Sequence, residues 1–381
     1  MKIGNPRICS ENEGIIRYEA TVDLADGPKE VWLDVPAAYA SWLCTDRADA
    51  FLVALVYYAM VLGEDVVCNA PVTEDLLYQI RDFIDVMATA NEELHKIKVQ
   101  ASQLPAIVRK AARANVTGLS CGIDSFTTLA AFSGEQLGSM KLTHLIFNKI
   151  GAQGVDDDGK AAHDFRLDNA RKCAEAVQLP LIETESNLHQ VAPLKHLECH
   201  IYRNAFVILA LQKGCSRYYY SSGYPLTEFN IRKYKKGNGF CELLCMETFS
   251  LPNLTFYSTA SSLDRFQRTE RVADFSPSYQ FLNVCFNPKS RGPNCTVFCE
   301  KCRRTILALE RAGKLHLYNK VFDLDLYEKN RQMVVRLACK ELARGNTAYY
   351  KSLWSVIKRN SRLAYLYFAY YWFLNLFRRK R

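Results

Sequence analysis

The chain has 381 residues, of which 49% are apolar and 23% charged, a composition typical of a globular protein and not of a fibrous or low-complexity one. This length allows one large domain with additions, or two or three smaller domains. Of the net charge of +9, eight positive charges lie in residues 351–381, which contain no Asp or Glu, so the other 350 residues carry only +1. No broad basic groove is expected, and nucleic acid is not predicted as a partner.

The first residues of the chain, Met1 to Pro6, have no apolar run behind Lys2, so we expect no secretory signal. In a chain of this length without such a signal, the 14 cysteines are interpreted as reduced thiols, some of them on a metal. A cytoplasmic location is predicted on this basis.

Residues 1–105 are predicted to form a separate accessory or partner-docking domain, since no catalytic pattern is found there. Alternating apolar residues predict two strands with a turn at residues 26–28, and longer apolar periodicities predict two helices. These elements are strands 15–24 and 30–33 and helices 46–62 and 73–98.

From residue 106 the pattern changes to strands and helices in alternation. The expected elements are strands 114–119, 142–147, 180–183 and 217–221 and helices 125–132, 161–177 and 202–213. Such alternation predicts an α/β fold with a parallel sheet covered by helices on both faces. Ligands of these sheets bind at the carboxyl ends of the strands. We place the catalytic domain at residues 106–315.

The segment between the first of these strands and its helix is predicted to bind phosphate. Small residues let the backbone approach a ligand closely, and the helix start presents unpaired N–H groups and a favourable dipole. Ser120 and Ser125 add hydroxyl donors. Asp124 is a poor direct ligand for phosphate, so we expect it to hold Mg²⁺ or to orient the loop. A helix cap without a ligand is the alternative.

This segment resembles the SGGxDS signature of N-type ATP pyrophosphatases (PP-loop proteins), and its six residues are Ser120, Cys121, Gly122, Ile123, Asp124 and Ser125. The resemblance implies an adenine nucleotide alpha hydrolase-like fold that binds ATP and Mg²⁺ through these residues. Cys121 replaces the middle glycine of the signature. Its side chain could narrow the nucleotide pocket, face the substrate, or be a buried inert thiol.

Three further segments resemble 7-cyano-7-deazaguanine synthases (QueC-like proteins). Residues 200–206 resemble the start of a family helix, 222–225 a Ser-Gly-Tyr-Pro turn, and 268–270 a Lys-x-Glu with Arg in place of Lys. The resemblance implies a catalytic role for Arg203, as a clamp for carboxylate or phosphate. It also implies a set of substrate-binding residues: Arg203, Asn204, Gly223, Tyr224 and Arg268.

Four cysteines cluster within 18 residues, at Cys285, Cys295, Cys299 and Cys302. Four thiolates in a chain expected to be reduced suit tetrahedral Zn²⁺, and a closed four-cysteine site is structural, not catalytic. The family that the chain resembles carries such a site after its catalytic sheet. Free buried cysteines are the alternative.

The resemblance implies that ATP adenylates a carboxylate, expected to be 7-carboxy-7-deazaguanine, with release of pyrophosphate and transfer of the acyl group to an amine. In the synthases the amine is ammonia. A branch of the family associated with antiphage defence transfers to a protein N-terminus, and the added domains favour this ligase with a protein substrate or operon partner. A plain synthase, or a nucleotide-binding scaffold without catalysis inside a defence complex, remains the alternative.

Residues 316–381 are predicted to form a helical C-terminal extension. Residues 363–377 are almost entirely apolar but short of the ~20 residues that a spanning helix needs. Two interpretations stay open: a helix in the membrane interface with a basic anchor, or a helix packed on the N-terminal part or across a homodimer.

Overall fold

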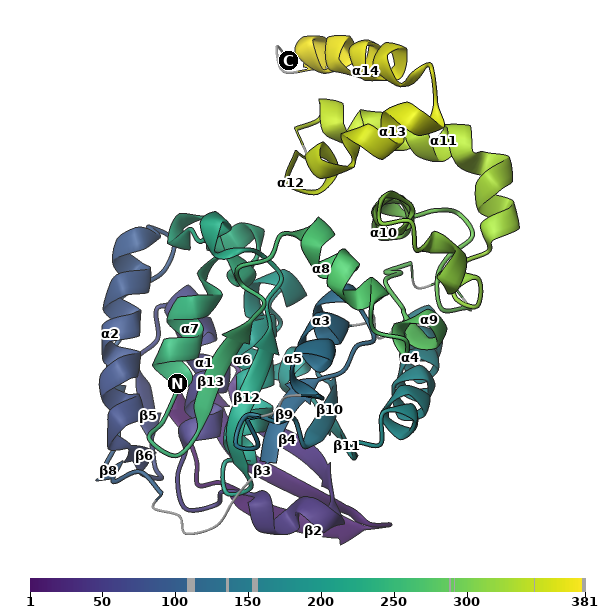
Figure 1. Ribbon diagram of the computed structural model, residues 1–381. Coiled ribbons are helices and arrows are strands. Elements are labelled where there is room, and N and C mark those ends of the chain that lie inside the picture. Colours follow the sequence, from purple (N-terminus) through teal and green to yellow (C-terminus); the bar gives the residue numbers. More distant parts are fainter. Residues whose placement is uncertain are drawn as a thin grey trace. The chain divides into compact units, whose positions relative to one another are not determined.

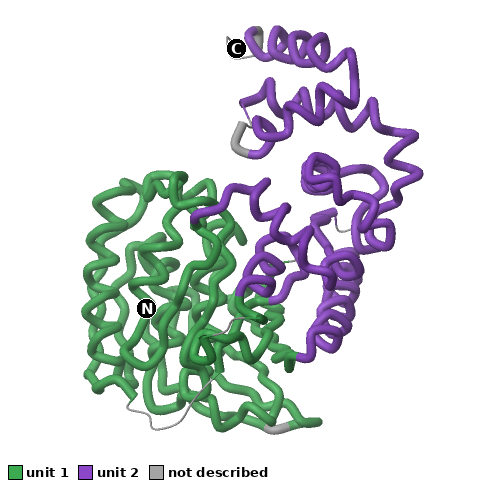
Figure 2. The backbone as a smooth tube through the Cα atoms, in the orientation of Figure 1, with its two compact units in different colours: residues 1–118, 132–152, 179–261 green, residues 119–131, 153–178, 262–381 purple. Residues whose placement is uncertain are grey.

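The computed structural model describes residues 1–107, 114–134, 137–152, 157–287, 289–290, 292–345 and 347–378. These residues form two compact units, shown in Figure 2. Unit 1 comprises residues 1–118, 132–152 and 179–261, and unit 2 comprises residues 119–131, 153–178 and 262–381. Each unit is described separately.

Unit 1 is built on one large mixed sheet (Figure 1). The strand order is β13-β12-β9-β10-β11-β4-β3-β1-β5-β7, and β2 pairs with β3 outside this path. Its strands are β1 (Lys2–Ile3), β2 (Arg7–Asn12), β3 (Ile15–Leu24), β4 (Gly27–Pro36), β5 (Val66–Cys68), β7 (Val99–Gln100), β9 (Ala114–Gly118), β10 (His144–Lys149), β11 (Leu181–Ser186), β12 (Cys215–Ser221) and β13 (Thr255–Thr259). A separate parallel pair joins β6 (Val72–Thr73) and β8 (Gln103–Leu104).

The strands β13, β12, β9, β10 and β11 are parallel to one another. The predicted α/β class with a mostly parallel sheet is therefore confirmed. Apolar side chains such as Val116, Ile146 and Ile182 are buried in it, as expected for strands covered by helices. Both β10 and β12 pair with β9, so the strand order reverses at β9. In sheets of this kind, ligands bind at the carboxyl ends of the strands where the order reverses.

The N-terminal strands do not form a sheet of their own. The hairpin predicted at 15–24 and 30–33 is present as β3 and β4, but β4 also pairs antiparallel with β11. Asn187 secures this join, because its side chain accepts from the Trp32 backbone N–H (2.9 Å) and donates to the Glu30 carbonyl (2.7 Å). The hairpin satisfies the backbone groups that would otherwise be exposed along β11. The expected domains were residues 1–105, 106–315 and 316–381. The compact units divide the chain differently, because unit 1 combines residues 1–105 with strands β9 to β13.

Helices of unit 1 pack on one another as well as on the sheet. In particular, α1 packs against α6, where the Tyr57 and Tyr202 rings stack with centroids 5.0 Å apart. Gly63, at φ 72°, ends α1 in the left-handed conformation that favours glycine. The α-helices are α1 (Asp49–Leu62), α2 (Glu74–Ala90), α5 (Leu188–Val191), α6 (His196–Ala210) and α7 (Glu242–Phe249). The 3-10 helices are η1 (Ala37–Trp42), η2 (Leu226–Glu228), η3 (Ile231–Lys236) and η4 (Asn238–Cys241).

The described part of unit 2 is helical. It contains all but the last residue of α3 (Ile123–Phe132), together with α4 (Asp157–Ala176), α8 (Arg265–Ala273), α9 (Ser278–Phe281), α10 (Glu300–Arg311), η5 (Leu315–Tyr318), α11 (Leu324–Ala343), α12 (Thr347–Tyr350), η6 (Lys351–Leu353), α13 (Trp354–Asn360) and α14 (Ala364–Arg378). The helical C-terminal end that the sequence predicts is thus confirmed. Among the described helices, none combines the length and the apolar character needed to cross a bilayer.

Candidate functional site

The predicted phosphate loop connects β9 to α3. Phe126 N donates to Gly122 O (3.0 Å), which closes the first turn of α3 and leaves the preceding N–H groups outside the helical ladder. The hydroxyl of Ser120 lies 3.3 Å from both the Gly122 N–H and the Ser125 hydroxyl. Ser125 in turn donates to Gly122 O at 3.1 Å. The loop therefore gathers two hydroxyl groups at a helix N-terminus, an arrangement suited to an anion.

Cys121 departs from this pattern in its backbone and in its side chain. It is one of the few non-glycine residues with positive φ, at 55°, a conformation that costs a side-chain-bearing residue roughly 1–2 kcal/mol. The side chain is buried next to Cys173 and Asn169 of α4, and hydrogen bonding to Cys173, followed by burial, raises the pKa of the Cys121 thiol. Of the three interpretations of Cys121, this geometry favours the buried inert thiol.

Asp124 holds two arginines of α8. Its Oδ1 lies 2.9 Å from Arg265 Nη1 and 3.1 Å from Arg268 Nη1. A capping box formed by Asp264 and Gln267 fixes the start of α8. Because Arg265 and Arg268 are three residues apart, one helix face carries both. The Arg268 side chain is only 1% exposed, so its charge is balanced inside the protein by the carboxylate of the phosphate loop.

Two further cations of α10 complete this group. The guanidinium of Arg304 lies 4.1 Å from the centroid of the Tyr349 ring, and that of Arg265 lies 5.9 Å from the same ring. Lys301 is an exposed residue, yet the pKa of its ammonium group is lowered. The larger cause is partial desolvation of the group by the protein around it, and the second is repulsion by the charge of Arg304. We call Arg265, Arg268, Lys301 and Arg304 the cation cluster. The sequence predicted only Arg268, although the i, i+3 spacing from Arg265 was a usable signal.

Arg203 lies in unit 1, where it contacts backbone. Its guanidinium is buried and donates to the carbonyls of Ile150, Ala192 and Leu194, each at 3.2 Å. The neighbouring Asn204 side chain donates to the His200 carbonyl at 2.7 Å. These contacts tie together the segments that follow β10 and β11. The geometry gives Arg203 a structural task in place of the predicted clamp on a ligand.

Replacing Arg203 with Met is therefore expected to destabilise the protein by about 3 kcal/mol or more, because three carbonyls would lose their donor and unpaired buried groups cost about 1–3 kcal/mol each. Urea unfolding measures this change. Arg217→Met is the matched control, since Arg217 donates to a single carbonyl, that of Ser139. If the two variants lost equal free energy of unfolding, and only Arg203→Met lost ligand binding, Arg203 would instead contact the ligand.

Gly223 and Tyr224 follow β12 in unit 1. The Ser222 hydroxyl donates to Tyr224 O (2.6 Å) and shapes the turn, while the Tyr224 ring stacks on Phe240 with centroids 4.2 Å apart. Tyr224 lines a shallow open hollow that has room for about one water molecule. Its other lining residues are Pro225, Leu226, Phe229, Gly239, Phe240, Glu242, Leu243 and Ser261. As it stands, this hollow is too small for an organic ligand.

The four predicted metal ligands meet in unit 2. Their sulfur atoms all lie within 4.8 Å of one another, with distances of 3.5 Å for Cys299–Cys302, 3.7 Å for Cys295–Cys302 and 3.9 Å for Cys285–Cys299. A Zn–S bond of about 2.3 Å in a tetrahedron requires sulfur atoms about 3.8 Å apart. The N–H groups of Asn287 and Cys299 each point at a cluster sulfur, at 3.3 Å. The cluster is thus compatible with a zinc ion, and these N–H groups would stabilise its thiolates.

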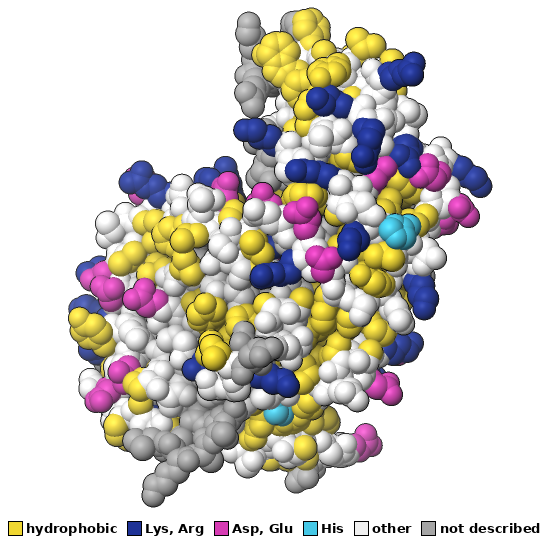
Figure 3. Space-filling view, viewed as in Figure 1, with side chains coloured by type: hydrophobic (Ala, Val, Ile, Leu, Met, Phe, Trp, Pro, Cys, Tyr) yellow, Lys and Arg dark blue, Asp and Glu magenta, His cyan; other side chains and the backbone are white. Residues whose placement is uncertain are grey.

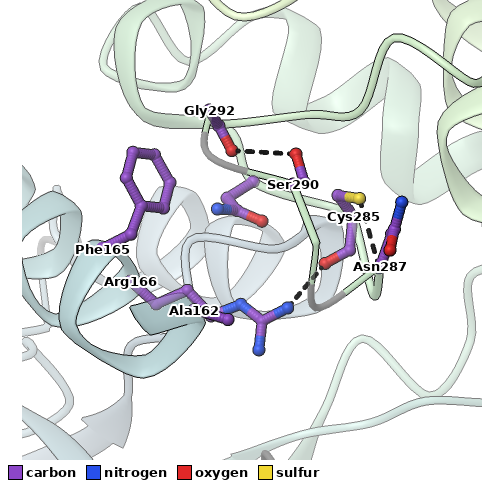
Figure 4. Close-up of a pocket in the computed structure, with 8 residues that line it drawn as sticks. Ala162, Phe165, Arg166, Cys285, Asn287, Ser290 and Gly292 are labelled. Atoms are coloured by element: carbon purple, nitrogen blue, oxygen red, sulfur yellow. Dashed lines mark hydrogen bonds between the residues drawn. The ribbon is translucent and has the colours of Figure 1, made fainter. Parts of the chain in front are cut away.

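The cysteine cluster also contacts α4 and the phosphate loop within unit 2. In Figure 4, Arg166 of α4 points toward the Cys285 loop, and its Nη2 donates to Cys285 O at 3.0 Å. These two residues line an open hollow of about 190 Å³ together with Asn283 and others. The Asn283 backbone N–H donates to Cys121 O at 2.8 Å. A single residue therefore separates the proposed zinc ligand Cys285 from Asn283, which supports the phosphate loop.

The structure brings the predicted site residues into two groups. The six loop residues, Arg268 and the four cysteines all belong to unit 2, whereas the four predicted residues Arg203, Asn204, Gly223 and Tyr224 belong to unit 1. The cations Arg265, Lys301 and Arg304 join the first group without having been predicted. Comparison with models of protein families, with curated proteins and with solved structures finds no match to this chain.

Proposed function

We propose that this chain is an ATP pyrophosphatase of the PP-loop type, with an adenine nucleotide alpha hydrolase-like fold, that activates a carboxylate as an adenylate. One observation carries the proposal: the loop at the start of α3 has its own carboxylate, Asp124, bound to two arginines of the cation cluster. A helix N-terminus with hydroxyl groups and adjacent cations suits a polyphosphate. A helix cap without a ligand would not need these cations.

In this reaction the substrate carboxylate attacks the α-phosphorus of ATP. The new bond joins a carboxylate oxygen to that phosphorus, the bond from phosphorus to the β-phosphate bridging oxygen breaks, and pyrophosphate leaves with the bond electrons. The loop N–H groups with Ser120 and Ser125 hold phosphate oxygens. The cation cluster stabilises the charge that develops on the leaving pyrophosphate, which lowers the barrier more than it stabilises bound ATP.

Mg²⁺ does not fit Asp124 as the structure has it. Two guanidinium groups share its Oδ1, and Lys301 is near enough for the Asp124 charge to offset part of the lowering of the Lys301 pKa. A divalent ion held there would be repelled by these cations. We therefore propose that Asp124 orients the two arginines, a role different from both predicted ones, which were to hold Mg²⁺ and to orient the loop.

The proposed acid is 7-carboxy-7-deazaguanine, and the proposed acceptor is the N-terminal amine of a protein partner in the cytoplasm. The resemblance of residues 200–206 and 222–225 to the synthase motifs supports the acid. Ammonia, as in a plain synthase, is the alternative acceptor. A scaffold that binds nucleotide without catalysis is the alternative class, and Cys121 at a glycine position of the motif favours it.

Exchange of labelled pyrophosphate into ATP tests the proposal, because only a reversible adenylation incorporates the label. Exchange is expected with 7-carboxy-7-deazaguanine present and not without an acid. Intact-mass spectrometry of a protein produced alongside the chain then separates a protein acceptor from ammonia. Binding of ATP without exchange for any acid offered would support the scaffold instead.

A further inference from the structure

One face of α14 consists of exposed apolar side chains. Figure 3 shows apolar side chains gathered over α14, at the top of the view. Five of the described side chains are more than half exposed, with Leu366 at 65% the most exposed of them. They are Tyr365, Leu366, Tyr370, Trp372 and Phe373. An apolar surface of this kind on a helix of a folded protein marks an interaction site.

The opposite face already packs on unit 2, so the exposed face is not part of its core. Ala364 is fully buried, and α14 packs against α11 and α13. Trp354 of α13 contacts the Phe368 ring, with centroids 5.7 Å apart, and also the Tyr365 ring at the border of the exposed face, with centroids 5.3 Å apart. These contacts fix which side of α14 points outward. The exposed face therefore requires a partner of its own.

Basic side chains lie beside this face. The Lys358 ammonium lies 5.8 Å from the centroid of the Tyr365 ring, and that of Lys340 lies 5.9 Å from the Tyr371 ring. Arg359 and Arg362 are exposed in the same segment. No Asp or Glu occurs in residues 342–381. A second copy of the chain docking here would bring like charges together, which costs free energy, whereas an anionic surface would be attracted.

We propose that α14 binds the surface of an anionic lipid bilayer, lying in its interface with the exposed face inserted. Tyr and Trp favour the boundary between headgroups and acyl chains, and the flanking Lys and Arg favour anionic headgroups. The 15-residue helix is about 22 Å long. It is too short to span the bilayer, so it anchors the protein at the surface.

Flotation of the full-length protein with lipid vesicles tests this inference. Binding is expected to vesicles of phosphatidylcholine with phosphatidylglycerol, to be weaker by roughly tenfold or more for phosphatidylcholine alone, and to fall in high salt. The double variant L366D/F373D is expected to lose binding, since both side chains are exposed and the fold does not depend on them. Y78D is the matched control, because Tyr78 on α2 is 76% exposed.

Three results would overturn the inference. Equal binding of the wild type to both vesicle types would remove the role of the basic residues. Unchanged binding of L366D/F373D would remove the role of the α14 face. A dimer in lipid-free solution that L366D/F373D dissociates would make a second copy the partner. The test does not depend on the proposed reaction, since acid-dependent pyrophosphate exchange in solution is expected to be the same in L366D/F373D and the wild type.

Discussion

Replacing Asp124 with Asn is expected to slow acid-dependent pyrophosphate exchange by about a hundredfold or more, the usual effect of losing one preorganised electrostatic group. The amide preserves the shape of the side chain but removes the charge that holds Arg265 and Arg268. The two guanidinium groups would then repel each other and leave the orientation in which they meet the pyrophosphate. The cluster meanwhile gains one net positive charge, so the KM for ATP should change less than kcat.

The dependence on Mg²⁺ distinguishes the proposed role of Asp124 from its predicted role as a metal ligand. If Asp124 orients the arginines, the variant needs the same Mg²⁺ concentration as the wild type for half its maximal rate. A strongly raised requirement would identify Asp124 as a metal ligand. Asp168→Asn is the matched control, because Asp168 lies on α4 of the same unit and pairs with Lys172 at the surface (2.6 Å). A full exchange rate in Asp124→Asn would refute the proposed site.

Replacing Cys302 with Ser is expected to remove the zinc ion and to destabilise unit 2 by about 3 kcal/mol or more, because structural zinc binding contributes directly to folding free energy. Zinc analysis of the purified protein should give one ion per chain for the wild type and a large loss for the variant. Thermal unfolding measures the stability. Treating the wild type with a chelator should lower its zinc content and its thermal stability toward those of the variant.

Cys339→Ser provides the matched control for this effect. Cys339 is a buried thiol of α11, outside the cluster and in the same unit. Changing a single buried side chain of this kind costs about 1–2 kcal/mol. If the four clustered cysteines were merely buried thiols, the two variants would have equal stability and neither preparation would contain zinc.

Much of unit 1 could be predicted from local sequence pattern. The hairpin and the alternation of strands and helices, which predicts a parallel sheet, follow from residues close together in the chain. The pairing of β4 with β11 could not be predicted, since nothing in residues 27–36 indicates a partner about 150 positions later. Sheet edges are chosen by tertiary packing, which sequence periodicity does not report.

The site shows the same limit. The phosphate loop and the four cysteines were recognisable because each lies within a short segment. The cation cluster as a whole was not, because its members come from α8 and α10 and are brought together by Asp124 and Tyr349. The backbone contacts of Arg203 could not be predicted for a related reason: whether a guanidinium meets a ligand or a backbone carbonyl depends on loops that are distant in sequence.

The join between β4 and β11 has a consequence for synthesis of the chain. The β3–β4 hairpin can form as soon as residues 15–36 leave the ribosome, but its β4 edge has no partner until residues 181–186 follow. At 5–20 residues per second, that edge stays open for about 7–30 seconds. An open strand edge is a template for pairing with other chains. Slow or stalled translation between these segments should therefore favour aggregation of the nascent protein.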